Sequence, residues 1–184
     1  MICPERTPGH YAFPRSLKSP VANRPSLDYC SVMQTNLMPY ITPTNAGPAL
    51  SAYGDTVLFL ATGKQTGGRY AAFIDITPPG GGPPPHFHKN EDELFFVIEG
   101  RMNFLVDGRW NEVGAGGYVF APRHSVHTFK NIGDRPSRML IHTSPAGFED
   151  FFTRSAEAFA RPGSPDMEKL TAIAAEHGIH FVQA

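Results

Sequence analysis

The chain has 184 residues, 41% of them hydrophobic, which suits one domain with a buried core and terminal extensions. Its formal net charge is -1 and it has no long basic run, which argues against nucleic acid or an anionic membrane as partner. No apolar stretch approaches the about 20 residues of a membrane span, and the prolines within residues 1–14 argue against a secretion signal.

Cysteine usage bears on the cellular compartment. The two cysteines, Cys3 and Cys30, lie near the N-terminus, and neither is part of a CxxC pair. Two cysteines so placed do not make a disulfide framework, and no activating context surrounds either thiol. We therefore expect a cytoplasmic protein.

Residues 1–50 are rich in Pro, Ser and Asn and show no sustained hydrophobic period. A loose arm is one interpretation. Scattered apolar side chains favour the other, an arm that packs on the rest of the chain or on a partner subunit, because disordered tails hold few such residues. These side chains are Tyr11, Phe13, Leu27, Tyr29, Met33, Leu37, Met38, Tyr40 and Ile41.

Residues 51–145 change to short runs rich in Val, Ile, Phe and Tyr, separated by Gly and Pro. Strands are predicted over residues 56–62, 69–77, 93–100, 101–108, 116–122 and 138–144. The pair Asp107-Gly108 predicts a tight hairpin turn. Short strands at roughly ten-residue spacing indicate an all-β sandwich or barrel.

Residues 146–184 change period again. Residues 147–160 place four phenylalanines near helical intervals, and residues 164–178 begin with Ser-Pro and end at Gly178. Ser is a common helix N-cap, Pro suits the first turn, and Gly ends helices. Two C-terminal helices packed on the β-structure are predicted.

The strongest chemical signal is a set of three histidines and a glutamate. His86 and His88 are two apart, so on an extended strand both imidazoles face one side. A hairpin after His88 would bring Glu93 beside them, and a neighbouring strand could supply His127. Imidazole and carboxylate together suit one divalent transition metal: Fe, Mn, Ni, Co, Cu or Zn. The competing interpretation is that the histidines are ordinary surface residues of a hairpin.

These residues resemble the two motifs of the cupin superfamily. The first motif is matched by Gly80, His86, His88, Glu93 and Gly100. The second is matched by Gly116, Pro122, His127 and Asn131, with His124 where the motif has glycine. The resemblance implies a cupin β-barrel of the jelly-roll type. Histidine visits positive φ more readily than β-branched residues do, so the loop at His124 is expected to survive.

Other residues receive weaker predictions. Phe95, Val97, Phe104 and Phe129 share the parity of nearby ligands and are predicted to line an apolar substrate pocket, with plain core packing as the alternative. Glu91 and Asp92 are interpreted as solvated loop charges and His124 as a rim residue. No metal role is expected for His142, and three further histidines lie outside the motifs: His10, His177 and His180.

The chain from about residue 50 onward further resembles small single-domain cupins of the quercetinase type (quercetin 2,3-dioxygenases), through residues 80–100, 122–131 and 144–152. That resemblance implies a metal-dependent dioxygenase acting on an enolisable or phenolic aromatic molecule, a flavonol or polyketide, with dioxygen as co-substrate. Glu93 would act both as metal ligand and as the base that takes the substrate's hydroxyl proton. Such a carboxylate beside the metal is within reach of a coordinated hydroxyl.

Two alternatives stay open at the level of sequence. The same four ligands would serve a non-redox isomerase, cyclase or lyase, and a cupin cavity can also bind a small molecule without catalysis. By analogy with related proteins, and because the apolar residues of the N-terminal arm could cross to a neighbour, a homodimer is expected.

Overall fold

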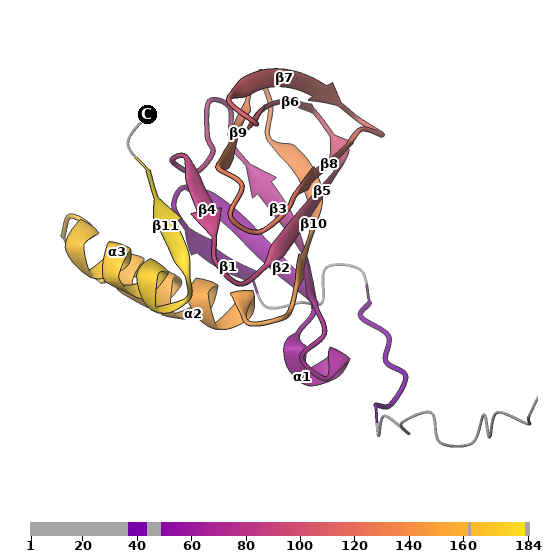
Figure 1. Ribbon diagram of the computed structural model, residues 1–184, viewed down its shortest axis with the longest axis vertical. Helices are drawn as coiled ribbons and strands as arrows, with labels where there is room; N and C mark the ends of the chain where they lie inside the picture. The colour runs from indigo at the N-terminus through magenta and orange to yellow at the C-terminus, as the bar shows by residue number, and fades with distance from the viewer. Residues whose placement is uncertain (1–36, 44–48, 162, 183–184) are drawn as a thin grey trace, which may run out of the picture. The chain divides into compact units, whose positions relative to one another are not determined.

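Two antiparallel sheets dominate the computed structural model, which describes residues 37–43, 49–161 and 163–182 (Figure 1). The first sheet has six strands in the order β1-β2-β3-β10-β5-β8, and the second has five in the order β11-β4-β9-β6-β7. In the first sheet these are β1 (Ala49–Ala52), β2 (Asp55–Ala61), β3 (Ala71–Thr77), β10 (Ser137–Ser144), β5 (Asp92–Glu99) and β8 (Tyr118–Ala121). In the second they are β11 (Ile179–Phe181), β4 (His86–His88), β9 (His127–Asn131), β6 (Arg101–Val106) and β7 (Arg109–Gly114).

The interior of this barrel is built from strands that alternate between buried and more exposed side chains. From Asp55 to Ala61 every second side chain of β2 is buried, and β10 follows the same pattern from Ser137 onward. This period of two is what a strand with one face against a core requires. The largest fully buried side chains include Phe73, Phe95 and Phe104. The predicted all-β jelly-roll barrel is confirmed.

The predicted hairpin turn at Asp107-Gly108 is confirmed. Both residues have positive φ, 52° for Asp107 and 70° for Gly108. Val106 and Arg109, which flank them, pair across β6 and β7. Two consecutive residues with positive φ match the twist of antiparallel strands, and Asp-Gly adopts that conformation at low cost.

The two C-terminal helices lie close to the predicted positions. Helix α2 spans Phe148–Phe159 and lies against β1, and α3 spans Met167–Glu176 and lies against α2 and β11 (Figure 1). Helix α3 begins later than predicted because Asp166, not Ser164, caps it: the Asp166 carboxylate accepts a hydrogen bond from the Lys169 backbone N–H at 3.0 Å. None of the helices in the described residues is long and apolar enough to cross a membrane.

The C-terminal segment does not end as a helix. After Gly178 the chain forms β11, which pairs with β4 through Ile179 opposite His88 and Phe181 opposite His86. A strand of three residues has too few positions to show a period, so the sequence did not reveal it. The C-terminal strand thereby lies directly beside the two histidines.

The N-terminal arm is described only in part. Within residues 37–43, the Thr42 hydroxyl donates a hydrogen bond to the carbonyl of Leu60 in β2 at 2.8 Å. Strand β1 starts at Ala49, inside the range assigned to the arm, and a short helix α1 (Gly63–Thr66) follows β2. The predictions for residues 1–36 and 44–48, including Cys3, Cys30 and His10, lie outside the described residues.

Candidate metal centre

Four side chains from three strands converge inside the barrel. His86 and His88 come from β4, Glu93 from β5 and His127 from β9, and one nitrogen or oxygen atom of each lies within 4.8 Å of those of the other three. All four residues are buried. The structure therefore brings together the four predicted metal ligands, in a cluster that is suited to hold a metal ion.

The strand geometry explains how residues far apart in the sequence meet. In β4 the two histidines are buried while Phe87 between them is more exposed, as alternation along a strand requires. His86 is paired with His127 across β4 and β9. Glu93 lies near the start of β5, where it is opposite Ala121 and Thr143.

Backbone carbonyls fix the orientation of two imidazole rings. His86 Nδ1 is 2.8 Å from the Pro84 carbonyl oxygen, and His127 Nδ1 is 2.9 Å from that of Ser125. A carbonyl can only accept, so each Nδ1 carries a proton and each ring presents its Nε2 to the cluster. This is how proteins commonly prepare a histidine for a metal ion.

The Glu93 carboxylate lies among the histidines and has an incomplete set of partners. Glu93 Oε2 is 3.0 Å from His127 Nε2 and 3.3 Å from His88 Nε2. Among the described residues, neither ring nitrogen of His88 finds a hydrogen-bond partner, although the side chain is fully buried. Buried polar atoms without partners are costly, and a cation between these nitrogens and Glu93 would satisfy them. The residues present thus fit a divalent transition metal ion.

The electrostatics give His86 and Glu93 the protonation states that a metal ion requires. Burial and the neighbouring His127 and His88 together lower the pKa of His86 to about 3, so His86 is neutral at physiological pH. Burial raises the pKa of Glu93, but His88, His127 and His86 outweigh it, so the net pKa falls and Glu93 is an anion. For His127 burial lowers the pKa, but the hydrogen bond to Glu93, the charge of Glu93 and the Ser125 carbonyl together outweigh burial, and the net pKa rises. A cation would compete with that proton.

Glu91 does not lie in solvent, contrary to the interpretation from sequence. It is 6% exposed, and its Oε2 is 3.6 Å from His88 Nδ1. A carboxylate behind a ligating imidazole orients the ring and raises its basicity. The spacing of three residues between His88 and Glu91 was the sequence signal for this contact. We interpreted Glu91 as solvated because charged residues in a turn between two strands usually lie in solvent. Asp92, in contrast, pairs with Arg123 at 2.9 Å at the partly exposed edge of the site.

The loop at His124 adopts the conformation that the missing glycine would favour. His124 has a φ of 69°, and its backbone N–H donates to the carbonyl of His88 at 2.7 Å. The loop that precedes β9 is thus tied to β4 by the backbone. The substitution leaves the turn geometry intact.

A cavity opens beside the cluster, and its lining differs in part from the prediction. Of the predicted pocket residues, Phe129 lines it, whereas Phe95, Val97 and Phe104 are fully buried in the core and do not. The alternation of side chains along a strand correctly placed these residues inside the barrel. Alternation does not tell how far along the barrel axis a side chain lies. All three side chains belong to the hydrophobic core of the barrel.

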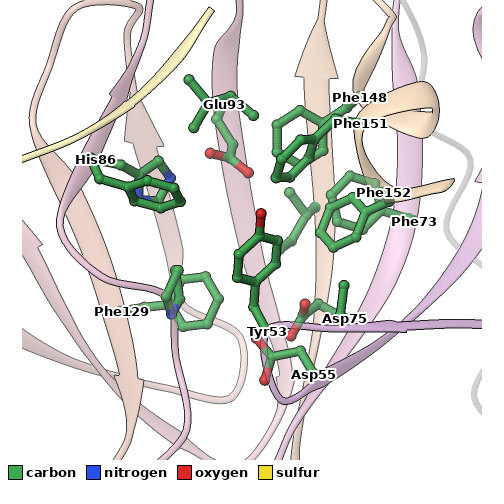
Figure 2. Close-up of a pocket in the computed structure, with 15 residues that line it drawn as sticks. Tyr53, Asp55, Phe73, Asp75, His86, Glu93, Phe129, Phe148, Phe151 and Phe152 are labelled. Atoms are coloured by element: carbon green, nitrogen blue, oxygen red, sulfur yellow. The ribbon is translucent and has the colours of Figure 1, made fainter. Parts of the chain in front are cut away.

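Helix α2 and the β1–β2 turn supply much of the cavity wall instead. Phe148, Phe151 and Phe152 from α2 face Phe129 across the cavity, with Tyr53 between them (Figure 2). The volume is about 60 Å³, several times the roughly 10–15 Å³ that one water molecule needs. Polar groups enter from His86, Glu93, Asp55 and Asp75, while the remaining lining is largely aromatic. The sequence marked the α2 phenylalanines as packing residues only.

The remaining described histidines lie apart from the cluster. His142 is on β10 and packs against Tyr70, with ring centroids 4.7 Å apart. His180 stacks on Phe87, and His177 is the C-cap residue of α3. The structure gives none of them a place among the four clustered side chains.

The barrel and its sequence have counterparts among known proteins. Residues 73–143 match the sequence model of the cupin domain family. A solved RmlC-like cupin from Shewanella frigidimarina shares the fold, with a TM-score of 0.54 and 21% identity over 62% of this chain and 96% of that one.

Two relatives of the chain have names that denote different reactions. The chain is 25% identical over 115 residues to quercetin 2,3-dioxygenase of Bacillus subtilis (strain 168), covering 62% of this chain and 34% of that protein. It is 34% identical over 72 residues to the polyketide synthase CurC of Streptomyces cyaneus, covering 39% of this chain and 47% of the relative. The chain thus spans less than half the length of either relative.

Proposed function

We propose that this chain is a metal-dependent dioxygenase that acts on an enolisable or phenolic aromatic molecule of the flavonol or polyketide type. The observation that carries the proposal is the buried His86, His88, Glu93 and His127 cluster at the wall of an aromatic cavity. The likeness to a quercetin 2,3-dioxygenase supports the reaction type. The mixed nitrogen and oxygen ligand set suits Fe, Mn, Ni, Co, Cu or Zn.

The three histidines would hold the ion, and Glu93 would be both ligand and base. A bound divalent ion acts as a Lewis acid that lowers the pKa of a coordinated hydroxyl and stabilises the oxyanion that forms. Glu93 is an anion whose second oxygen can accept that hydroxyl proton. An ion held by His86, His88, Glu93 and His127 could also bind substrate or dioxygen at positions that these side chains leave open.

The cavity wall supplies positioning and exclusion of water. Phe148, Phe151 and Phe129 present aromatic faces and edges on which a flat ligand ring can pack. Because Glu93 and His86 line the same cavity as these rings, a ligand held between them could place a polar edge near Glu93. An apolar site also strengthens the electrostatic contacts made by Glu93.

The polyketide relative favours a second candidate. A non-redox cyclase, isomerase or lyase could use the same cluster, with Glu93 again as base, and the 34% identity to CurC is the observation in its favour. Such a reaction consumes no oxygen and proceeds with redox-inert Zn.

One experiment separates the two candidates. Purified protein is loaded with Fe, Mn, Ni, Co, Cu or Zn in turn, and a panel of flavonols and polyketide phenols is followed by oxygen electrode and mass spectrometry. A dioxygenase consumes oxygen in step with product and stops under nitrogen. Turnover that persists without oxygen would reject the dioxygenase and support the second candidate. Glu93→Gln should abolish either activity, and His142→Ala is the matched control.

We also propose a homodimer formed through the outer face of β5 and β8. Tyr118 and Phe120 on the edge strand β8 are 57% and 50% exposed, and Phe96 lies opposite Tyr118. Contiguous exposed aromatic residues of this kind mark association surfaces. The double variant Tyr118→Lys, Phe120→Lys should convert a dimer into a monomer in light scattering, whereas Trp110→Lys on β7 should not. A wild-type monomer at micromolar concentration would contradict the proposal.

A cytoplasmic location is proposed on the cysteine usage alone. Cell fractionation with a C-terminal epitope tag tests it, and recovery outside the cytoplasm would overturn it.

A further inference from the structure

A second buried polar pair lies in the cavity and is not used by the mechanism above. Asp55 is on β2 and Asp75 on β3, and both line the cavity that also contains His86 and Glu93. Val57 is paired with Asp75, and Asp55 lies two residues before Val57 on the same strand face. The two carboxyl groups are therefore diagonal cross-strand neighbours. Figure 2 shows them together below the Tyr53 ring, with Glu93 beyond its hydroxyl end.

The partners of this pair are incomplete. Asp55 is 6% exposed and Asp75 is 2% exposed. The Thr77 hydroxyl donates to Asp75 Oδ1 at 2.5 Å, whereas Asp55 Oδ1 has no hydrogen-bond partner in the part of the chain that the structure describes. Among the described residues, neither carboxyl group forms an ion pair. An unpartnered carboxyl oxygen that lines a cavity is costly for folding and available to a ligand.

The environment keeps a proton on the pair near neutral pH. Burial and the charge of Asp75 together raise the pKa of Asp55 to about 8, although a hydrogen bond with Thr77 acts in the opposite direction. Burial likewise raises the pKa of Asp75 to about 7, even though the hydrogen bond from Thr77 acts in the opposite direction. A carboxylic acid beside a carboxylate offers one hydrogen-bond donor and several acceptors. A hydroxyl group, which both donates and accepts, complements that set.

The backbone of the β1–β2 turn is shaped around this end of the cavity. Tyr53 has a φ of 57°, which is rare for a bulky residue and costs free energy. Its ring is stacked on Phe151 with centroids 5.8 Å apart, and its hydroxyl lies 3.4 Å from Ser155 Oγ. The Tyr53 ring thus lies next to Asp55 and forms an aromatic wall between the Asp55–Asp75 pair and Glu93 (Figure 2).

We propose that Asp55 and Asp75 form a second ligand-binding group, which hydrogen-bonds a hydroxyl group carried by the ligand at the cavity end away from Glu93. The proposal narrows the ligand class to aromatic molecules that carry two oxygen groups. One oxygen would lie near His86 and Glu93, and a hydroxyl group would bind to Asp55 and Asp75. This specificity rests on the proposed function in placing the ligand in this cavity. The hydroxyl contact itself requires no metal ion and no turnover.

The test uses metal-free full-length protein, with phenol and toluene as probes. The two molecules have nearly the same shape and differ in the hydroxyl group, so the ratio of their dissociation constants reports the hydrogen bond. Binding is followed by NMR shifts of the Ile141 and Ile179 methyl groups, which line the cavity. Wild type should prefer phenol by about three- to tenfold, the range of one net hydrogen bond.

The variants Asp55→Leu and Asp75→Leu keep the approximate side-chain shape and remove the hydrogen-bonding atoms, which asparagine would retain. We expect each to reduce the phenol preference to less than about twofold. The exposed Asp134→Leu is the matched control and should retain the preference. Circular dichroism verifies that each variant folds. An unchanged preference in both Asp variants, or wild type that binds neither probe in the cavity, overturns the proposal.

The phenol-binding test can fail or succeed independently of the oxygen-consumption test of the proposed function. Protein that prefers phenol through Asp55 and Asp75, yet consumes no oxygen with any phenol when metal-loaded, would reject the dioxygenase and uphold the carboxyl pair. Oxygen consumption that is equally selective for hydroxylated substrates in wild type and in Asp55→Leu would uphold the dioxygenase and reject the carboxyl pair.

Discussion

Two buried polar groups face one cavity, and they differ in what balances their charge. The Glu93 carboxylate lies 3.0 Å from His127 and 3.3 Å from His88. Asp55 and Asp75 lie near each other (Figure 2), and Asp75 accepts a hydrogen bond from the neutral Thr77 hydroxyl. Imidazoles lower the pKa of Glu93, while burial raises those of the aspartates. Carboxylates in one barrel thus take opposite roles: one is prepared for a cation, the other pair for a proton.

The largest expected effect is the removal of one imidazole. His86→Ala or His127→Ala takes away one nitrogen ligand and leaves the Glu93 charge poorly compensated, so the purified protein should lose nearly all of its bound metal. Elemental analysis measures this directly, with His142→Ala as a control outside the cluster. A full metal complement in either variant would show that the ligand assignment is wrong.

Glu91 should matter through His88 rather than by direct contact with the metal. Glu91→Gln removes the carboxylate 3.6 Å behind His88 Nδ1, and metal affinity should fall about tenfold or more. Competition with a chelator gives the affinity. The adjacent Asp92→Asn, which changes a partly exposed pair with Arg123, should stay within about twofold of wild type. An equal loss of metal affinity in Glu91→Gln and Asp92→Asn would contradict a specific role of Glu91 behind His88.

The carboxyl pair should make stability depend on pH in the direction opposite to Glu93. Because the folded-state pKa of Asp55 is about 8, above that of an unfolded aspartate, the folded protein binds more protons than the unfolded chain. Its contribution to stability is therefore full below about pH 4 and is lost as the pH rises towards 8. In metal-free protein, Asp55→Asn should have a Tm roughly 5 °C above wild type at pH 8 and a smaller difference at pH 4. A difference that is constant with pH would contradict the raised pKa.

The smallest effect is expected at His124, on the loop that is tied to His88. His124→Gly should relieve the positive φ and stabilise the protein by at most about 1 kcal/mol, while His124→Ala should destabilise it relative to glycine. Thermal unfolding compares the three proteins. A loss of metal in the glycine variant would show that the imidazole of His124 contributes to the site, beyond its backbone.

Residue patterns that are local in the sequence predicted much of the fold and the candidate metal cluster. The period of two in β2 and β10, the Asp107-Gly108 turn and the helical spacing of the α2 phenylalanines are set by neighbours in the chain, so the elements followed from sequence with small errors at their ends. His86, His88, Glu93 and His127 were found because strand alternation and a short hairpin fix where side chains point. Strand β11 was missed because three residues show no period.

The sequence by itself determined the barrel, the cluster of three histidines and a glutamate, and the class of chemistry they support. The tertiary structure decided which side chains face the cavity: it placed Phe95, Val97 and Phe104 in the closed core, and it set Asp55 beside Asp75. It also buried Glu91 against His88. The physical reason is the same in each case. Alternation tells on which side of a strand a residue lies, whereas depth in the barrel, burial and the pKa depend on strands and helices that are distant in sequence.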